Sequence, residues 1–153
     1  MKELPDRGLS PEAAMNGSIE IEIPARADYV SLVRLVVAAA AELAPSLEPS
    51  RIDDLRVVVS EATTNAIQAH IRSGCTRPVR VCCRCSDGRV SVTVRDQGPG
   101  FDVEALPEMP PPESPARLGR ESGMGISIIR TLADESHFRS GPEGTEVHLA
   151  FLR

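Results

Sequence analysis

The stretch EATTNA at residues 61–66 decides how this chain of 153 residues is best interpreted. Apolar residues recur at helical spacing on both sides of it, which predicts a long amphipathic helix from about Ser50, its N-cap, to Arg72. Glu61 and Asn65 are four residues apart, so their side chains lie on one face of this helix. A carboxamide oxygen can bind Mg²⁺, and a neighbouring carboxylate can accept a proton. A solvated polar pair is the alternative for these two residues by themselves.

A second motif, DQGPG at residues 96–100, directly follows an alternating segment that predicts a strand. Asp96 can accept a hydrogen bond from an amine. Gly98 and Gly100 allow the backbone to turn sharply or to approach a flat ligand closely. A plain Asp-Gly turn is the alternative interpretation.

The third motif, SGMG at residues 122–125, leads into an apolar helical segment that ends near Leu132. Glycines before a helix expose unpaired N–H groups at its positive end, which can bind an anion without a lysine. This is relevant because 16 of the 17 basic residues are arginine and the single lysine is Lys2. The composition therefore excludes the P-loop lysine, the strand lysine of eukaryotic-type protein kinases and lysine Schiff-base chemistry.

The remaining patterns complete an α/β arrangement with the element order βααββαββ. Alternation predicts strands, and helical spacing predicts one further helix; the strands are 18–23, 79–85, 89–95, 135–140 and 145–152, and the helix is 27–44. This order predicts an α/β two-layer sandwich, in which helices cover one face of a mixed, mainly antiparallel sheet. We expect a mobile tail at 1–17 and a single domain over 18–153, with a functional lid at about 97–122, a segment that contains six prolines.

Charge and cysteine content limit the possible partners. The net charge of −5 argues against direct nucleic-acid binding, and no apolar run is long enough for a membrane span, so we expect a cytoplasmic protein. The cysteines, Cys75, Cys82, Cys83 and Cys85, predict reduced thiols, since bridges along one strand are geometrically poor. A zinc site at Cys82 and Cys85 is the alternative, although a second ligand pair is lacking.

Taken jointly, the three motifs resemble the GHKL (Bergerat-fold) ATPases, and within them the RsbW-type anti-sigma factor serine/threonine-protein kinases. EATTNA resembles the N box, DQGPG the first glycine box, and residues 123–125 the second glycine box. Gly144-Thr145 matches the late threonine position, and the similarity covers roughly residues 19–152.

The resemblance implies a role for each matching residue. Asn65 would bind Mg²⁺ at the phosphates of ATP, and Asp96, supported by Thr145, would bind the adenine amino group. Glu61 would be the general base that takes the proton from a serine hydroxyl. Arg120, at the end of the lid, would stabilise the developing charge. The residues that would shape the pocket and hold phosphate are Gly98, Gly100, Gly123, Met124 and Gly125.

One histidine departs from the family pattern. Members commonly have a histidine four residues after the Asn, but here that residue is Ala69 and His70 follows it. A displacement of one residue turns a side chain about 100° around a helix. We therefore expect His70 to lie outside the site, at the surface or partly packed.

The function that the resemblance implies is that of an anti-sigma factor with kinase activity. It would sequester an RNA polymerase sigma factor and use Mg-ATP to phosphorylate a serine on a STAS-domain antagonist. The resemblance also implies a homodimer, whose interface would include the first helix and the first strand. Two alternatives stay open: a nucleotide-dependent binding module without phosphate transfer, and a stand-alone ATPase domain like that of histidine kinases. Glu61 argues against the first, and the second requires a phosphoacceptor histidine on a helix pair, for which 153 residues leave no room.

Overall fold

The computed structural model describes residues 17–43, 47–86, 88–100 and 121–153, with the backbone only from 121 to 124. The elements in chain order are β1 (Gly17–Ile23), the short 3-10 helix η1 (Ala27–Tyr29), α2 (Val30–Leu43), α3 (Pro49–Ser73), β2 (Val79–Ser86), β3 (Arg89–Asp96), α4 (Glu121–Leu132), β4 (Glu135–Gly141) and β5 (Gly144–Leu152). The predicted order of strands and long helices is confirmed.

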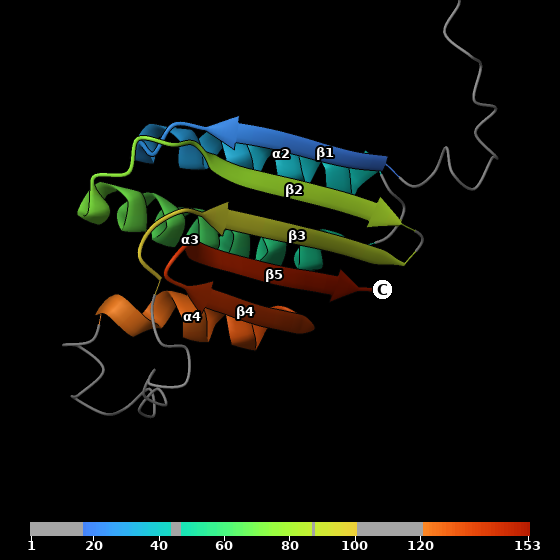
Figure 1. The fold of residues 1–153 in the computed structure, drawn as a ribbon. Helices are drawn as coiled ribbons and strands as arrows, with labels where there is room; N and C mark the ends of the chain where they lie inside the picture. The colour runs from blue at the N-terminus through green and yellow to red at the C-terminus, as the bar shows by residue number, and fades with distance from the viewer. Residues whose placement is uncertain (1–16, 44–46, 87, 101–120) are drawn as a thin grey trace, which may run out of the picture.

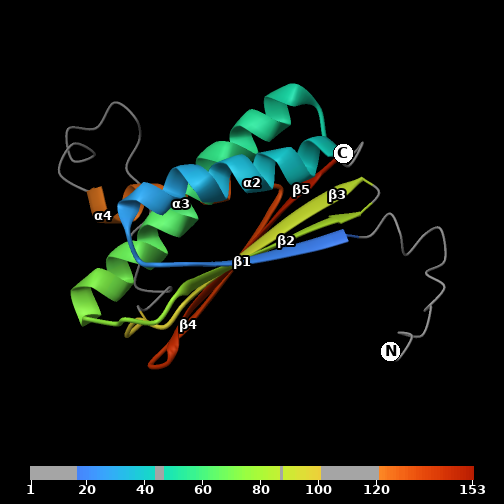
Figure 2. The same cartoon turned by 90° about the horizontal axis from the view of Figure 1, so that it is seen from above.

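The described strands form one sheet in the order β1-β2-β3-β5-β4, and each neighbouring pair is antiparallel. Helices α2, α3 and α4 lie on the same side of this twisted sheet (Figures 1 and 2). The structure is thus the predicted two-layer sandwich, with a described sheet that is antiparallel throughout. Chain reversals after β2 and β4 are short, and Gly141 pairs with Gly144 across the last turn.

The core forms where alternating strand residues meet the helix layer. Val90, Val92 and Val94 of β3 are buried, whereas the intervening polar residues face the uncovered side of the sheet. In the helix layer, Leu55 and Val59 of α3 have no exposed surface. The buried stripe of α3 fixes the rotation of this helix, and therefore which of its polar residues can face the site.

Two helix starts differ from the prediction. Helix α3 begins at Pro49 and its N-cap is Glu48, not Ser50, because proline suits the first helical turn, where its missing N–H costs nothing. Helix α4 begins at Glu121, so the glycines at 123 and 125 lie within its first turns and not before it. The glycines were correctly predicted to lie at the start of this helix, but the predicted helix began after them.

The zinc alternative for the cysteines is not supported. Cys83 lies on the helix-covered face of β2 and is buried, and Cys85 shares this face because side chains alternate along a strand. Cys82 therefore faces the opposite side of the sheet from Cys85, and the two cannot share a metal ion. Within the described ranges, no helix is long and apolar enough to cross a membrane.

Candidate nucleotide site

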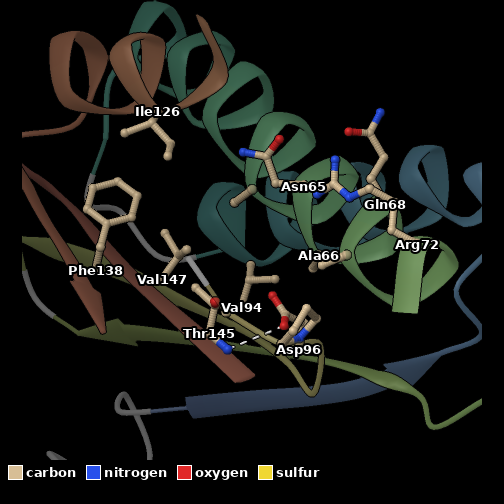
Figure 3. A pocket seen from close by; sticks show the side chains of 14 residues that line it. Asn65, Ala66, Gln68, Arg72, Val94, Asp96, Ile126, Phe138, Thr145 and Val147 are labelled. Carbon is tan, nitrogen blue, oxygen red and sulfur yellow. Dashed lines mark hydrogen bonds between the residues drawn. The ribbon is translucent and has the colours of Figure 1, made fainter. Parts of the chain in front are cut away.

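A cavity of about 280 Å³ lies between α3, α4 and the sheet (Figure 3). Three alanines of α3 form part of its wall and leave room for a ligand, and the sheet and α4 supply larger apolar side chains. Four polar side chains, Asn65, Gln68, Arg72 and Asp96, line it from α3 and the end of β3. The apolar lining residues and Thr145 are Ala62, Ala66, Ala69, Val94, Pro99, Gly100, Ile126, Phe138, Thr145 and Val147. A mostly apolar cavity with a few polar groups is typical of a small-molecule site.

Asp96 supplies a buried acceptor to this cavity. Its side chain lies at the end of β3 and the residue is 9% exposed. Its Oδ1 accepts hydrogen bonds from the N–H groups of Gly98, at 2.9 Å, and Thr145, at 3.3 Å. Figure 3 shows the bond from Thr145 as a dashed line. Burial raises the pKa of Asp96 above its ordinary value, and these two backbone bonds act against that rise. Both of these bonds go to Oδ1, so with respect to the described residues Oδ2 can accept a further hydrogen bond from a ligand.

Strand register brings Thr145 to Asp96. The two residues are partners in the β3–β5 ladder, and the Thr145 hydroxyl lies 2.8 Å from that of Ser140. The preceding Gly144 has a φ of 138°, and a Cβ there would collide with the carbonyl oxygen of Asp96. Glycine at 144 is therefore required for this close approach.

Gly98 and Gly100, which follow Asp96, allow their loop to pack closely between α3 and the hairpin of β4 and β5. A Cβ on Gly98 would lie 3.0 Å from the Cβ of Ala69 on α3. Gly100 has a φ of 77°, and a Cβ there would collide with the carbonyl oxygen of Gly141. Both glycines thus permit the close packing that shapes the loop end of the cavity.

The other end of the site joins the first and third sequence motifs. A Cβ on Gly125 would lie 2.8 Å from Oε2 of Glu61 and 3.2 Å from Nδ2 of Asn65. The two side chains of α3 therefore reach the same point on the backbone of α4. Asn65 also lines the cavity, whereas Glu61 lies one turn closer to the start of α3.

The close approach of Gly125 to Glu61 leads to a prediction for the variant Gly125→Ala. The added methyl group should displace the flexible end of Glu61, while alanine favours the helix, so the melting temperature should change little. If Glu61 acts on a substrate, we expect phosphate transfer to fall by about 10- to 100-fold, because catalysis is sensitive to small displacements of a catalytic group. Gly17→Ala is the matched control, because a Cβ there meets nothing within 4 Å. An unchanged transfer rate in Gly125→Ala would contradict this role for the contact.

Part of the predicted site falls on residues that the structure does not describe. Arg120 and the central part of the predicted lid, 101–120, fall outside the described residues, as do residues 1–16 of the predicted tail. Gly123 and Met124 belong to α4, but only their backbone is described. Their predicted roles therefore stay predictions.

The expectation that His70 lies at the surface or is only partly packed was wrong, but His70 is not among the residues that line the described cavity. Its side chain is fully buried at 0% exposure, and it hydrogen-bonds to the loop that follows Asp96. The signal was available in the sequence, because spacings of three and four residues from Ile67 and Ala66 place position 70 on the buried stripe of α3. The pocket-lining Gln68 and Arg72 were also missed, since polar helix residues give no pattern that separates a cavity from solvent.

Comparison with known proteins identifies the class first. Residues 23–151 match the family model described as "Histidine kinase-like ATPase domain", so the chain belongs to this class of ATPase domains. Within the class, it belongs to the family of the serine-protein kinase RsbW. It is 34% identical over 121 residues to RsbW of Staphylococcus epidermidis, covering 76% of each chain. It is 36% identical over 136 residues to the anti-sigma F factor of Pasteuria penetrans, covering 86% of this chain and 87% of the relative.

Solved structures share the fold at lower identity. The RsbU and RsbW domains of Rv1364c from Mycobacterium tuberculosis match with a TM-score of 0.65 at 18% identity, over 89% of this chain and 32% of that chain. The SiaB-SiaC complex from Pseudomonas aeruginosa matches with a TM-score of 0.55 at 17% identity, over 88% of this chain and 89% of that chain. These matches support the architecture described above.

Proposed function

We propose that this protein is an ATP-dependent serine kinase that also acts as an anti-sigma factor. The observation that carries the proposal is that the buried acceptor Asp96 and Asn65 line one cavity, and that Glu61 meets Asn65 beside Gly125. Relatives more than 30% identical are named serine-protein kinase RsbW and anti-sigma F factor. Membership of an ATPase-domain family implies the use of ATP.

The cavity is suited to an adenine base. Asp96 offers a carboxylate oxygen to an exocyclic amino group, while Val94 and Val147 form part of an apolar lining that suits a flat ring. Thr145 supports Asp96 through its backbone N–H, which restrains the carboxylate before the ligand arrives. We assign the adenine subsite to this end of the cavity.

The Glu61–Asn65 end is suited to the phosphates. Asn65 would hold Mg²⁺ through its amide oxygen, and few protein ligands are needed because Mg²⁺ usually keeps waters and binds substrate phosphates. When bound, the ion supplies charge neutralisation to the phosphates. Glu61 would accept the proton of the attacking serine hydroxyl. The first turn of α4, which includes Gly123, would hold phosphate through the backbone N–H groups that a helix start leaves unpaired. Met124 and Gly125 would shape the pocket beside it, and Arg120 would stabilise the developing charge.

The partners proposed are a sigma factor and a STAS-domain antagonist that carries the phosphorylated serine. We also propose that the protein is a homodimer in the cytoplasm. Each subunit would have one domain over residues 18–153, and Gly98 and Gly100 would shape the loop end of its nucleotide site. Relatives named anti-sigma F factor and RsbW support the choice of partners.

Calorimetry and a transfer assay together test the proposal. Titration of the purified protein with ATP in the presence of Mg²⁺ should show saturable binding. Co-purification from the native host should recover a sigma factor and a STAS protein, and radiolabelled phosphate should pass from ATP to a serine of the latter. Absence of nucleotide binding would overturn the whole proposal, whereas binding without transfer to the recovered STAS protein would reduce it to a nucleotide-dependent binding module.

A further inference from the structure

We infer that His70 is a positioning residue for the nucleotide site, holding the loop that follows Asp96 against α3. The inference rests on the proposed function, because the loop matters only if Asp96 binds a nucleotide. His70 is not among the residues that line the described cavity, so it acts through the loop and not on the ligand.

The hydrogen bonds of His70 define its protonation state. Nε2 lies 2.7 Å from the backbone nitrogen of Gln97, and Nδ1 lies 2.9 Å from the carbonyl oxygen of Arg77. A backbone N–H can only donate and a carbonyl oxygen can only accept, so Nε2 must accept and Nδ1 must donate. The buried ring is therefore a neutral imidazole with its proton on Nδ1.

These bonds restrain the segment that carries the adenine-binding acceptor. Gln97 follows Asp96 directly, and the next residue, Gly98, donates its N–H to Oδ1 of Asp96. A second link runs from the Arg77 guanidinium to Oε1 of Gln97, at 2.7 Å. The backbone of Gln97 thus ties the loop to His70 on α3, and its side chain ties the loop to Arg77, in the segment between α3 and β2. Restraint of a site before binding lowers the ordering cost of binding.

Positions 69 and 70 of α3 contact the loop after Asp96 in different ways. The Ala69 side chain lines the cavity and lies against Gly98, so a larger side chain at 69 would occupy the space that the loop and the ligand need. From position 70, about 100° further around the helix, the imidazole reaches the N–H of Gln97 instead. In this chain, Ala69 therefore leaves room for the loop, and His70 anchors it.

Two substitutions separate the bond to Gln97 from the bond to Arg77. The oxygen of His70→Gln can take the place of Nε2 and accept from Gln97, whereas His70→Asn can donate to the Arg77 carbonyl but is too short to reach Gln97. We expect His70→Gln to keep the Kd for Mg-ATP within about threefold of the wild type. We expect His70→Asn to raise the Kd, and the KM for ATP, by about tenfold or more while kcat stays within about threefold.

The controls separate positioning from general stability. Each His70 variant loses one buried hydrogen bond, so melting temperatures without nucleotide should fall for both, and a purely structural role would leave their ATP affinities alike. His137→Asn is the matched control, because His137 is exposed on the uncovered face of the sheet, and it should leave the Kd unchanged. Equal affinities for the two His70 variants, with a wild type that binds ATP, would overturn the inference and leave the proposed function standing.

A measurement on the wild type keeps the inference testable if His70→Asn does not fold. The ¹⁵N spectrum of the side chain should show the neutral ring with its proton on Nδ1, and the Gln97 amide should be protected from exchange. A ring protonated on Nε2, or a rapidly exchanging Gln97 amide, would contradict the anchoring. Failure of the wild type to bind ATP would instead overturn the proposed function, and this spectrum would still decide whether the anchor exists.

Discussion

Replacing Glu61 by glutamine is expected to abolish phosphate transfer while leaving nucleotide binding intact. Glutamine has nearly the same shape and can keep the packing against Gly125, but it cannot accept a proton as a carboxylate does. General bases contribute about 10²- to 10⁴-fold to the rate, so transfer of radiolabelled phosphate to the partner serine should fall by that factor. The Kd for Mg-ATP, measured by calorimetry, should stay within about threefold of the wild type.

Asn65→Ala provides the contrast for this experiment. Asn65 lines the cavity one helical turn from Glu61, and its amide oxygen is the proposed Mg²⁺ ligand. We expect this variant to lose affinity for Mg-ATP as well as transfer, whereas Glu61→Gln loses transfer only. Transfer at the wild-type rate by Glu61→Gln would show that another group accepts the serine proton, and the assignment of the base would fail.

Local patterns in the sequence were sufficient to predict most of the fold. Alternation marks β3 because one of its faces is buried and the other is not, and helical spacing marks α3 for the same reason. The spacing of Glu61 and Asn65 also predicted their common face. These properties depend on neighbouring residues along one element, so a single sequence contains them.

Features that depend on contacts between distant segments could not be predicted in this way. The pairing of Asp96 with Thr145 is set by the register of β3 and β5, and only the family resemblance suggested that threonine. The approach of Gly125 to Glu61 depends on how α4 packs against α3. The place of His70 on the buried stripe of α3 could be predicted from helical spacing, but its hydrogen bond to Gln97 could not. Tertiary packing decides each of these cases.

Asp96→Asn is expected to lose ATP binding without losing stability. The asparagine oxygen can accept the same bonds from Gly98 and Thr145, but its amide nitrogen then faces the adenine amino group, which is also a donor. Leaving these donors unpaired should cost about 2 kcal/mol, or about a 30-fold increase in the Kd for Mg-ATP. Inosine triphosphate has a carbonyl oxygen where adenine has the amino group, so the variant should shift its preference toward that nucleotide.

Dependence on pH tests the same residue in the wild type. Burial raises the pKa of Asp96 in the folded protein above its ordinary value of 3.8. The folded state therefore holds the proton more tightly than the unfolded chain, and the stability gained from the protonated form is lost as pH rises through the folded pKa. At neutral pH the ionised Asp96 thus lowers the free energy of unfolding, and Asp96→Asn should raise the melting temperature or leave it unchanged.

Binding should depend on pH in the opposite direction to stability. The ionised carboxylate is the acceptor for adenine, so ATP affinity should fall as pH decreases through the raised pKa of Asp96, while the unliganded protein gains stability from this group. Calorimetry and thermal melts over the same acidic pH series measure the two effects, and Asp96→Asn should lack both. A wild-type affinity that stays constant until the protein unfolds in acid would rule out Asp96 as the adenine acceptor.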